Sequence, residues 1–102
     1  MMTPAGEIDQ ASLRGLCRSH HVRRLAVFGS VARGDARPDS DIDLLVDYDP
    51  AQRVTYFDLV DLSDRLGALF GDHRPVDLVT EQALHPLIRK HVRRELVVLY
   101  EG

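Results

Sequence analysis

Hydrophobic residues recur at two spacings along this chain, and each spacing predicts its own kind of element. Recurrence every three or four positions predicts amphipathic helices over residues 8–20, 54–70 and 84–92. Short apolar runs predict strands over residues 24–28 and 75–79. The pattern of the apolar segment 96–100 leaves its element type open.

One further strand is predicted over residues 41–46, where apolar and polar positions alternate. Its apolar face has Ile42, Leu44 and Val46. Asp41 and Asp43 occupy the opposite face, because side chains two positions apart point to the same side of a strand. Both carboxylates are therefore expected to point in the same direction.

A turn and a short helix are expected between these two central strands. Gly29 ends the strand 24–28, Ser30 is a favourable N-cap residue, and Gly34 is a favourable helix stop. About one helical turn is expected between them, and residues 35–40 are expected to form a loop.

Brief strands separated by helical stretches predict an α/β (α+β) fold. We expect a short mixed β-sheet with helices packed on one face. The length of 102 residues predicts a single domain over residues 1–102.

The composition is that of an ordinary soluble globular protein, with 44% hydrophobic and 28% charged residues. No apolar run approaches the roughly 20 residues needed to cross a bilayer, and no secretory signal is visible, so a cytoplasmic location is expected. A net charge of -3 argues against an extended nucleic-acid surface. Cys17 is the only cysteine and is expected in the core.

Three acidic residues are candidate metal ligands and catalytic groups. Asp41 and Asp43 can converge on metal ions between them, since successive residues on one strand face lie roughly 6.5 to 7 Å apart at Cα. Two magnesium ions about 3.5 to 4 Å apart would clamp the attacking and leaving oxygens of a displacement at phosphorus. Asp77 is a lone acid in an apolar strand, where burial without a cation is costly. If the two strands are neighbours, Asp77 can join the metal site and accept a proton.

The turn that precedes the acids is a candidate phosphate site. Gly29 allows close approach of the backbone, and a helix that opens at Ser30 offers free N–H groups and a positive dipole end. Arg33 lies one turn further on and can reach released pyrophosphate with its planar guanidinium, with Arg37 as an alternative. Each feature alone also has an ordinary explanation, as a turn, an N-cap or exposed loop acids. Their combination at this spacing favours a nucleotidyl transfer site.

At these residues the chain resembles the DNA polymerase β-type nucleotidyltransferase superfamily, and in particular its minimal MNT-type members. The shared pattern is Gly29-Ser30, ten residues, and then Asp41-Ile42-Asp43. The resemblance implies that Asp41, Asp43 and a third acid, here Asp77, bind the catalytic metals. It implies that Gly29 and Ser30 contact the phosphates of the nucleotide.

Minimal proteins of this kind are similar to the antitoxin of a toxin-antitoxin pair whose partner is a HEPN-domain toxin encoded by the adjacent gene. The resemblance implies transfer of AMP from ATP to a tyrosine of that toxin, in a hetero-oligomer without direct nucleic-acid or membrane contact. Two alternatives stay open. The domain can neutralise the toxin by binding without catalysis, or it can modify a small hydroxyl compound such as an aminoglycoside.

Overall fold

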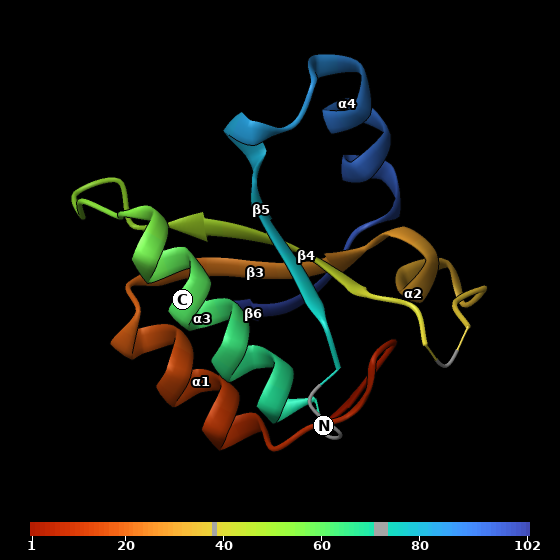
Figure 1. The fold of residues 1–102 in the computed structure, drawn as a ribbon, viewed down its shortest axis with the longest axis horizontal. Coiled ribbons are helices and arrows are strands. Elements are labelled where there is room, and N and C mark those ends of the chain that lie inside the picture. The colour runs from red at the N-terminus through yellow and green to blue at the C-terminus, as the bar shows by residue number, and fades with distance from the viewer. Residues whose placement is uncertain (38, 71–73) are drawn as a thin grey trace.

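The computed structural model describes residues 1–37, 39–70 and 74–102. Its central element is a four-stranded sheet in the order β5-β4-β3-β6 (Figure 1). Its strands are β3 (Val22–Phe28), β4 (Ile42–Tyr48), β5 (Val76–Thr80) and β6 (Val97–Glu101). The predicted short mixed sheet is confirmed, because β3 runs antiparallel to β4 and β6 whereas β4 runs parallel to β5.

Strand direction brings three chain segments to one end of the sheet. The C-terminal end of β3 lies beside the N-terminal end of β4, with Phe28 opposite Asp43. The N-terminal end of β5 lies on the other side of β4, with Asp77 opposite Asp43. The candidate site residues are therefore gathered by strand pairing rather than by a loop.

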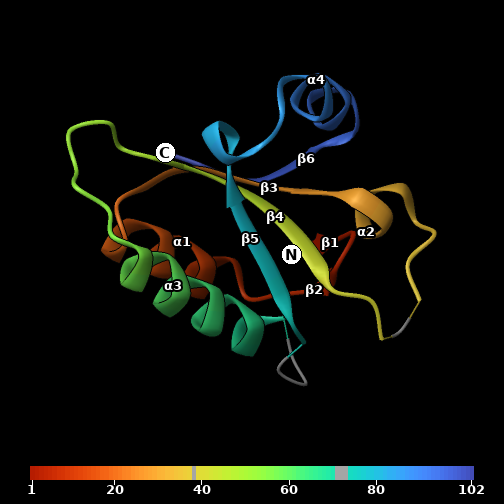
Figure 2. The same cartoon turned by 45° about the horizontal axis from the view of Figure 1, so that its top comes forward.

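Helices α1 (Gln10–Ser19) and α3 (Tyr56–Leu69) pack side by side on one face of the sheet (Figures 1 and 2). Asp9 caps α1 through the N–H of Ser12. Thr55 and Asp58 form a reciprocal capping box at the start of α3, which satisfies two backbone donors. The helices predicted over residues 8–20 and 54–70 are thus confirmed, and side-chain caps set their N-terminal ends.

Two short helices lie away from that pair. Helix α2 (Gly29–Arg33) follows β3 directly, and α4 (Pro86–Glu95) packs against α2 (Figure 2). Pro86 occupies the first turn of α4, where its missing N–H costs nothing. Chain segments 29–33 and 86–95, far apart in the sequence, therefore meet beside the end of β3.

Three small elements were not predicted. Strands β1 (Met2–Thr3) and β2 (Gly6–Glu7) form a hairpin, and η1 (Glu81–Ala83) is one 3₁₀ turn after β5. Residues 2–7 are too few for a periodic pattern, so their pairing leaves no trace in hydrophobic spacing. Among the described helices, none combines the length and the apolar character that a membrane crossing requires.

The hydrophobic core lies between the sheet and the α1–α3 layer. Its fully buried members include Leu25 and Leu44 of the sheet and Leu62 and Leu66 of α3. Cys17 is buried in this core as predicted, and burial raises the pKa of its thiol to about 12. The core thus fixes the strands whose ends carry the acidic residues.

Two local predictions need correction or extension. The N-cap of α2 is Phe28 and not Ser30, because the helix already begins at Gly29, whose φ of 75° turns the chain out of β3. Gly34 ends α2 as predicted, with a φ of 81°. The segment of undetermined type is β6, an edge strand paired with β3. Gly71, the predicted end of the long helix, lies outside the described residues.

Replacement of Leu66 by alanine tests the core. Leu66 has 0% exposure, so Leu66→Ala should lower the free energy of unfolding by about 2 to 5 kcal/mol in urea denaturation. Leu87→Ala removes the same atoms from a side chain that is 76% exposed, and should change it by less than about 0.5 kcal/mol. Equal losses in the two variants would contradict this description of the core.

Candidate functional site

The three candidate acids lie at the end of the sheet where β4 and β5 begin. Asp43 and Asp77 are paired in register on these parallel strands, so the condition set for a shared site is met. Asp41 lies one residue before β4 and is exposed. The structure therefore places Asp77 beside Asp43, with Asp41 two residues away along the chain.

The expected burial of Asp77 is wrong. Its side chain is exposed, because β5 is an edge strand of the sheet. Asp43, on the inner strand β4, is the more enclosed of the two. An acid open to solvent at a sheet edge can exchange protons and can meet an incoming group, so the position still suits a proton acceptor.

Electrostatic repulsion links the three acids. Partial burial raises the pKa of Asp43, and the negative charges of Asp77 and Asp41 raise it further. Arg33 opposes this shift, whereas Glu95 adds to it. Asp43 is thus held where its ionised form is disfavoured unless a cation is nearby.

Gly29 is in direct contact with the carboxylate of Asp43. A Cβ atom at position 29 would overlap Oδ2 of Asp43 and would lie 3.2 Å from its Cγ. The φ of 75° adds a second restriction, since residues with a side chain rarely adopt it. Glycine is therefore required here for two independent reasons, and it places the turn against the acid.

Arg33 is held by two carboxylates. Its Nη1 donates to Oε2 of Glu95 at 3.0 Å, and its Nε lies 3.4 Å from Oδ2 of Asp35. The other oxygen of Glu95, Oε1, accepts a hydrogen bond from the Gly29 N–H at 3.0 Å. Sequence reasoning missed Glu95 because, in a predominantly basic helix, one acid gives no pattern that separates it from a solvated surface residue.

Glu95 itself is stabilised in its ionised form. Burial alone would raise its pKa, but the hydrogen bonds from Arg33 and from the Gly29 N–H outweigh burial and lower it. Charge-assisted hydrogen bonds of this kind are stronger than those between neutral groups. The contact between α4 and α2 is therefore an ionic one.

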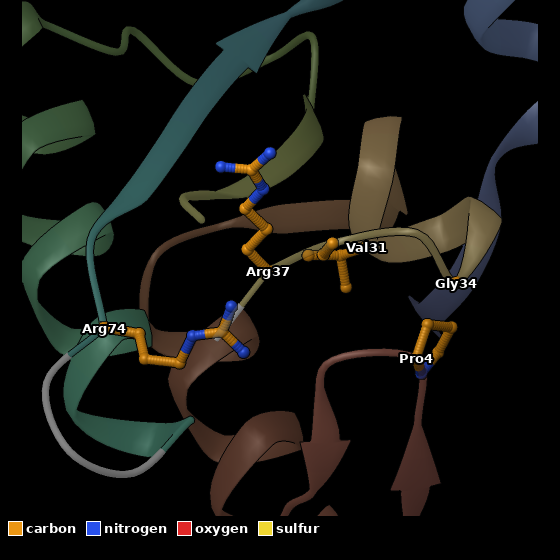
Figure 3. Close-up of a pocket in the computed structure, with 6 residues that line it drawn as sticks. Pro4, Val31, Gly34, Arg37 and Arg74 are labelled. Atoms are coloured by element: carbon orange, nitrogen blue, oxygen red, sulfur yellow. The ribbon is translucent and has the colours of Figure 1, made fainter. Parts of the chain in front are cut away.

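A pocket of about 240 Å³ opens beside the loop that follows α2 (Figure 3). The described residues that line it are Pro4, Val31, Gly34, Ala36, Arg37 and Arg74. Arg74 also donates from Nη2 to the Ser40 carbonyl at 2.9 Å, which ties the segment before β5 to the loop before Asp41. Arg37 thus borders a pocket whose lining includes none of the three acids.

The donor set at the strand ends fits magnesium in its chemistry. Carboxylate oxygens are the ligands that Mg²⁺ prefers, and the mutual repulsion of Asp41, Asp43 and Asp77 is the kind that a bound cation relieves. In the part of the chain that the structure describes, no three His, Cys, Asp or Glu side chains are already arranged to hold a metal. Strand pairing brings the acids together, and the three-ligand set stays a prediction.

Comparison with known proteins gives a consistent result. The family model described as "Nucleotidyltransferase domain" matches residues 11–99. The protein adenylyltransferase MntA of Thermococcus cleftensis is 43% identical over 76 residues, which are 74% of this chain and 73% of the relative.

Solved structures with the same fold include a provisionally assigned minimal nucleotidyltransferase, with a TM-score of 0.70 and 42% identity over 86% of each chain. A toxin-antitoxin crystal structure with AMP-PNP has a TM-score of 0.71 at 21% identity, covering 93% of this chain and 75% of that one. A tri-AMPylated HEPN toxin of Shewanella oneidensis in complex with its MNT antitoxin has a TM-score of 0.62 at 19% identity, covering 91% and 70%. These last two show likeness of fold.

Gly29→Ala tests the contact between the turn and Asp43. The added methyl group would meet the carboxylate and would require a strained φ, so we expect a loss of about 1 to 3 kcal/mol in unfolding free energy. Gly15→Ala in α1 is the matched control, because its Cβ would meet nothing within 4 Å. The free energy of unfolding of that variant should rise by up to about 1 kcal/mol. A neutral Gly29→Ala would contradict the close approach.

Asp43→Asn tests the unfavourable ionisation of Asp43, which partial burial and the charges of Asp77 and Asp41 together cause. The folded-state pKa of Asp43 is raised, so its ionisation opposes folding, and stability falls as the pH rises from the ordinary value of 3.8 through the raised one. At pH 7 without divalent cations, Asp43→Asn should therefore have a higher melting temperature than the unaltered protein.

The control for this experiment is Asp47→Asn on the same strand. Asp47 forms an exposed ion pair with Arg23 at 2.9 Å, so its replacement should leave Tm unchanged or slightly lower. A melting temperature of Asp43→Asn at or below that of the unaltered protein would contradict the unfavourable ionisation of Asp43.

Proposed function

This chain belongs to the nucleotidyltransferase domain family, and from that premise we propose that it transfers AMP from ATP to a tyrosine hydroxyl of a HEPN-type toxin partner. The predicted family and the predicted enzyme class are confirmed by the family match and the adenylyltransferase relative. Acceptor, metal and partner are the parts that we propose. A cytoplasmic location, where ATP is available, belongs to the same proposal.

The observation that carries the proposal is the pairing of Asp43 with Asp77 beside Gly29. It puts acidic oxygens and a phosphate-sized backbone turn at one end of the sheet. A triphosphate needs both features, because its charge requires cations held by acidic oxygens and its own oxygens accept hydrogen bonds from backbone N–H groups.

We assign the phosphates of ATP to the turn formed by Gly29 and Ser30, with Arg33 at the end that becomes pyrophosphate. Asp41, Asp43 and Asp77 would hold two Mg²⁺ ions, which when bound neutralise charge on the transferring phosphoryl group. Because Asp43 lies in contact with Gly29, it would keep the metal ions at a constant distance from the turn that binds the phosphates.

In the proposed transfer step, one bond to phosphorus forms, one breaks, and a proton passes to this chain. The tyrosine hydroxyl oxygen attacks the α-phosphorus, and the bond from that phosphorus to the bridging oxygen of pyrophosphate breaks. Asp77, exposed at the sheet edge, accepts the hydroxyl proton. The products are a tyrosine carrying AMP, pyrophosphate and a protonated carboxyl group that returns its proton to water.

The partner assignment is supported by the relatives and by the surface of this chain. The Thermococcus relative is named a protein adenylyltransferase, and the two toxin-antitoxin structures contain AMP-PNP or an AMPylated HEPN toxin. Tyr56 and Phe57 are 74% and 82% exposed, and Leu87 and Ile88 project from α4. Exposed aromatic and aliphatic side chains of this kind are typical of protein interfaces.

The test is transfer of label from α-labelled ATP to the product of the adjacent gene in the presence of Mg²⁺. Asp41→Asn and Asp43→Asn should each lower the rate by about a thousandfold, because metal-assisted charge stabilisation contributes several kcal/mol. Asp47→Asn, further along β4 and paired with Arg23, should keep the rate. Mass spectrometry of the labelled partner identifies the acceptor residue.

The outcomes separate the alternatives. Absence of label with the unaltered protein would refute the proposal, and label on a small hydroxyl compound alone would favour a small-molecule transferase. If Asp41→Asn still neutralises the toxin without measurable transfer, the chain acts by masking its partner.

A further inference from the structure

Glu95 joins two helices, α4 and α2, that lie far apart in the sequence. It is the last residue of α4, and its side chain is only 14% exposed. Its two oxygens accept hydrogen bonds from Gly29, at the start of α2, and from Arg33, at the end of the same helix. One carboxylate therefore bridges both ends of α2.

Helix α2 depends on tertiary contacts, of which the burial of Val31 in the core is one and the contact with Glu95 is another. It has five residues, and isolated helices of this length do not form in water. Its N-cap residue is Phe28, whose side chain cannot accept a hydrogen bond from the exposed N–H groups of the first turn. Glu95 supplies that missing acceptor from a distant part of the chain, and its negative charge suits the positive end of the helix.

We propose that Glu95 is a positioning residue for nucleotide binding, which holds the Gly29 turn and the Arg33 guanidinium in place before ATP arrives. This inference rests on the proposed function, because it takes the turn and Arg33 as the phosphate side of the site. Arg33 keeps 46% of its side chain exposed while bound to Glu95, so it remains accessible to a ligand.

The opposite role would be an internal anion that occupies the place of a phosphate. The contacts favour positioning, because Glu95 takes up only Nη1 of the Arg33 guanidinium and the Gly29 N–H, and the Arg33 side chain stays open to solvent. The two roles also predict opposite changes in the KM for ATP. Removal of a positioning group weakens binding, and removal of a competing anion strengthens it.

The kinetic test compares Glu95→Ala with Glu81→Ala. Glu95→Ala should raise the KM for ATP about five- to tenfold and change kcat less than about twofold, because a preset contact contributes equally to the bound substrate and the transition state. Glu81 pairs with Arg93 of α4, so Glu81→Ala removes an ion pair from the same helix without touching α2. Its kinetic constants should not change.

Two further variants separate positioning from general stability. Glu95→Gln keeps an oxygen for the Gly29 N–H but loses the charge opposite Arg33, so its KM should lie between those of the unaltered protein and Glu95→Ala. In the double variant with Arg33→Ala and Glu95→Ala, the fold increase in KM for ATP should be smaller than the product of the fold increases in the two single variants. A KM that is unchanged or lower in Glu95→Ala would overturn the proposal.

A measurement without substrate keeps this inference distinct from the proposed function. Amide hydrogen exchange at residues 29–33 should be faster in Glu95→Ala than in the unaltered protein and in Glu81→Ala, whether or not AMP transfer occurs. Absence of transfer by the unaltered protein would refute the proposed function. Normal transfer together with unchanged exchange and unchanged KM in Glu95→Ala would refute the role of Glu95 alone.

Discussion

The site depends on the parallel pairing of β4 with β5, which keeps Asp43 and Asp77 side by side although their charges repel. Ile42 and Leu44 flank Asp43 on the same strand and are fully buried against the core. Burial of one such side chain contributes about 1.5 to 3 kcal/mol, so a few of them outweigh repulsion between partly solvated carboxylates. The apolar face of β4 thus holds the polar face in an arrangement that the acids alone would not adopt.

The sheet order gives the two acids different surroundings. Asp43 is on an inner strand, in contact with Gly29 and near Arg33 and Glu95, and is restricted by its neighbours. Asp77 is on an edge strand and open to solvent. One acid is therefore suited to a constant position beside the turn, and the other is suited to meet a group that arrives from outside the molecule.

Hydrophobic periodicity was sufficient to predict the helices α1 and α3 and the strands β3, β4 and β5, because each buries a continuous face in the core. The motif from Gly29 to Asp43 was sufficient to predict that the Gly29 turn and Asp43 lie at the same end of the sheet. Exposure was not predictable in the same way. Asp77 was expected to be buried because Val76 and Leu78 flank it, but the position of β5 at the edge depends on pairing across the whole sheet. Glu95 was missed because a contact across 66 residues has no local pattern.

The pairing of the edge strand β6 with β3 determines which residue of α4 contacts α2. Val97 is paired with Val27 in an antiparallel ladder, so continuing the alignment by two residues brings Glu95 opposite Gly29. A slip of β6 by two positions would leave the same side-chain faces toward the core, so the alternation of faces alone does not oppose it. It would, however, bring a cation, Arg93, or the aliphatic Val97 opposite the Gly29 N–H. The ionic contact thus favours one strand alignment among those that the alternation of faces permits.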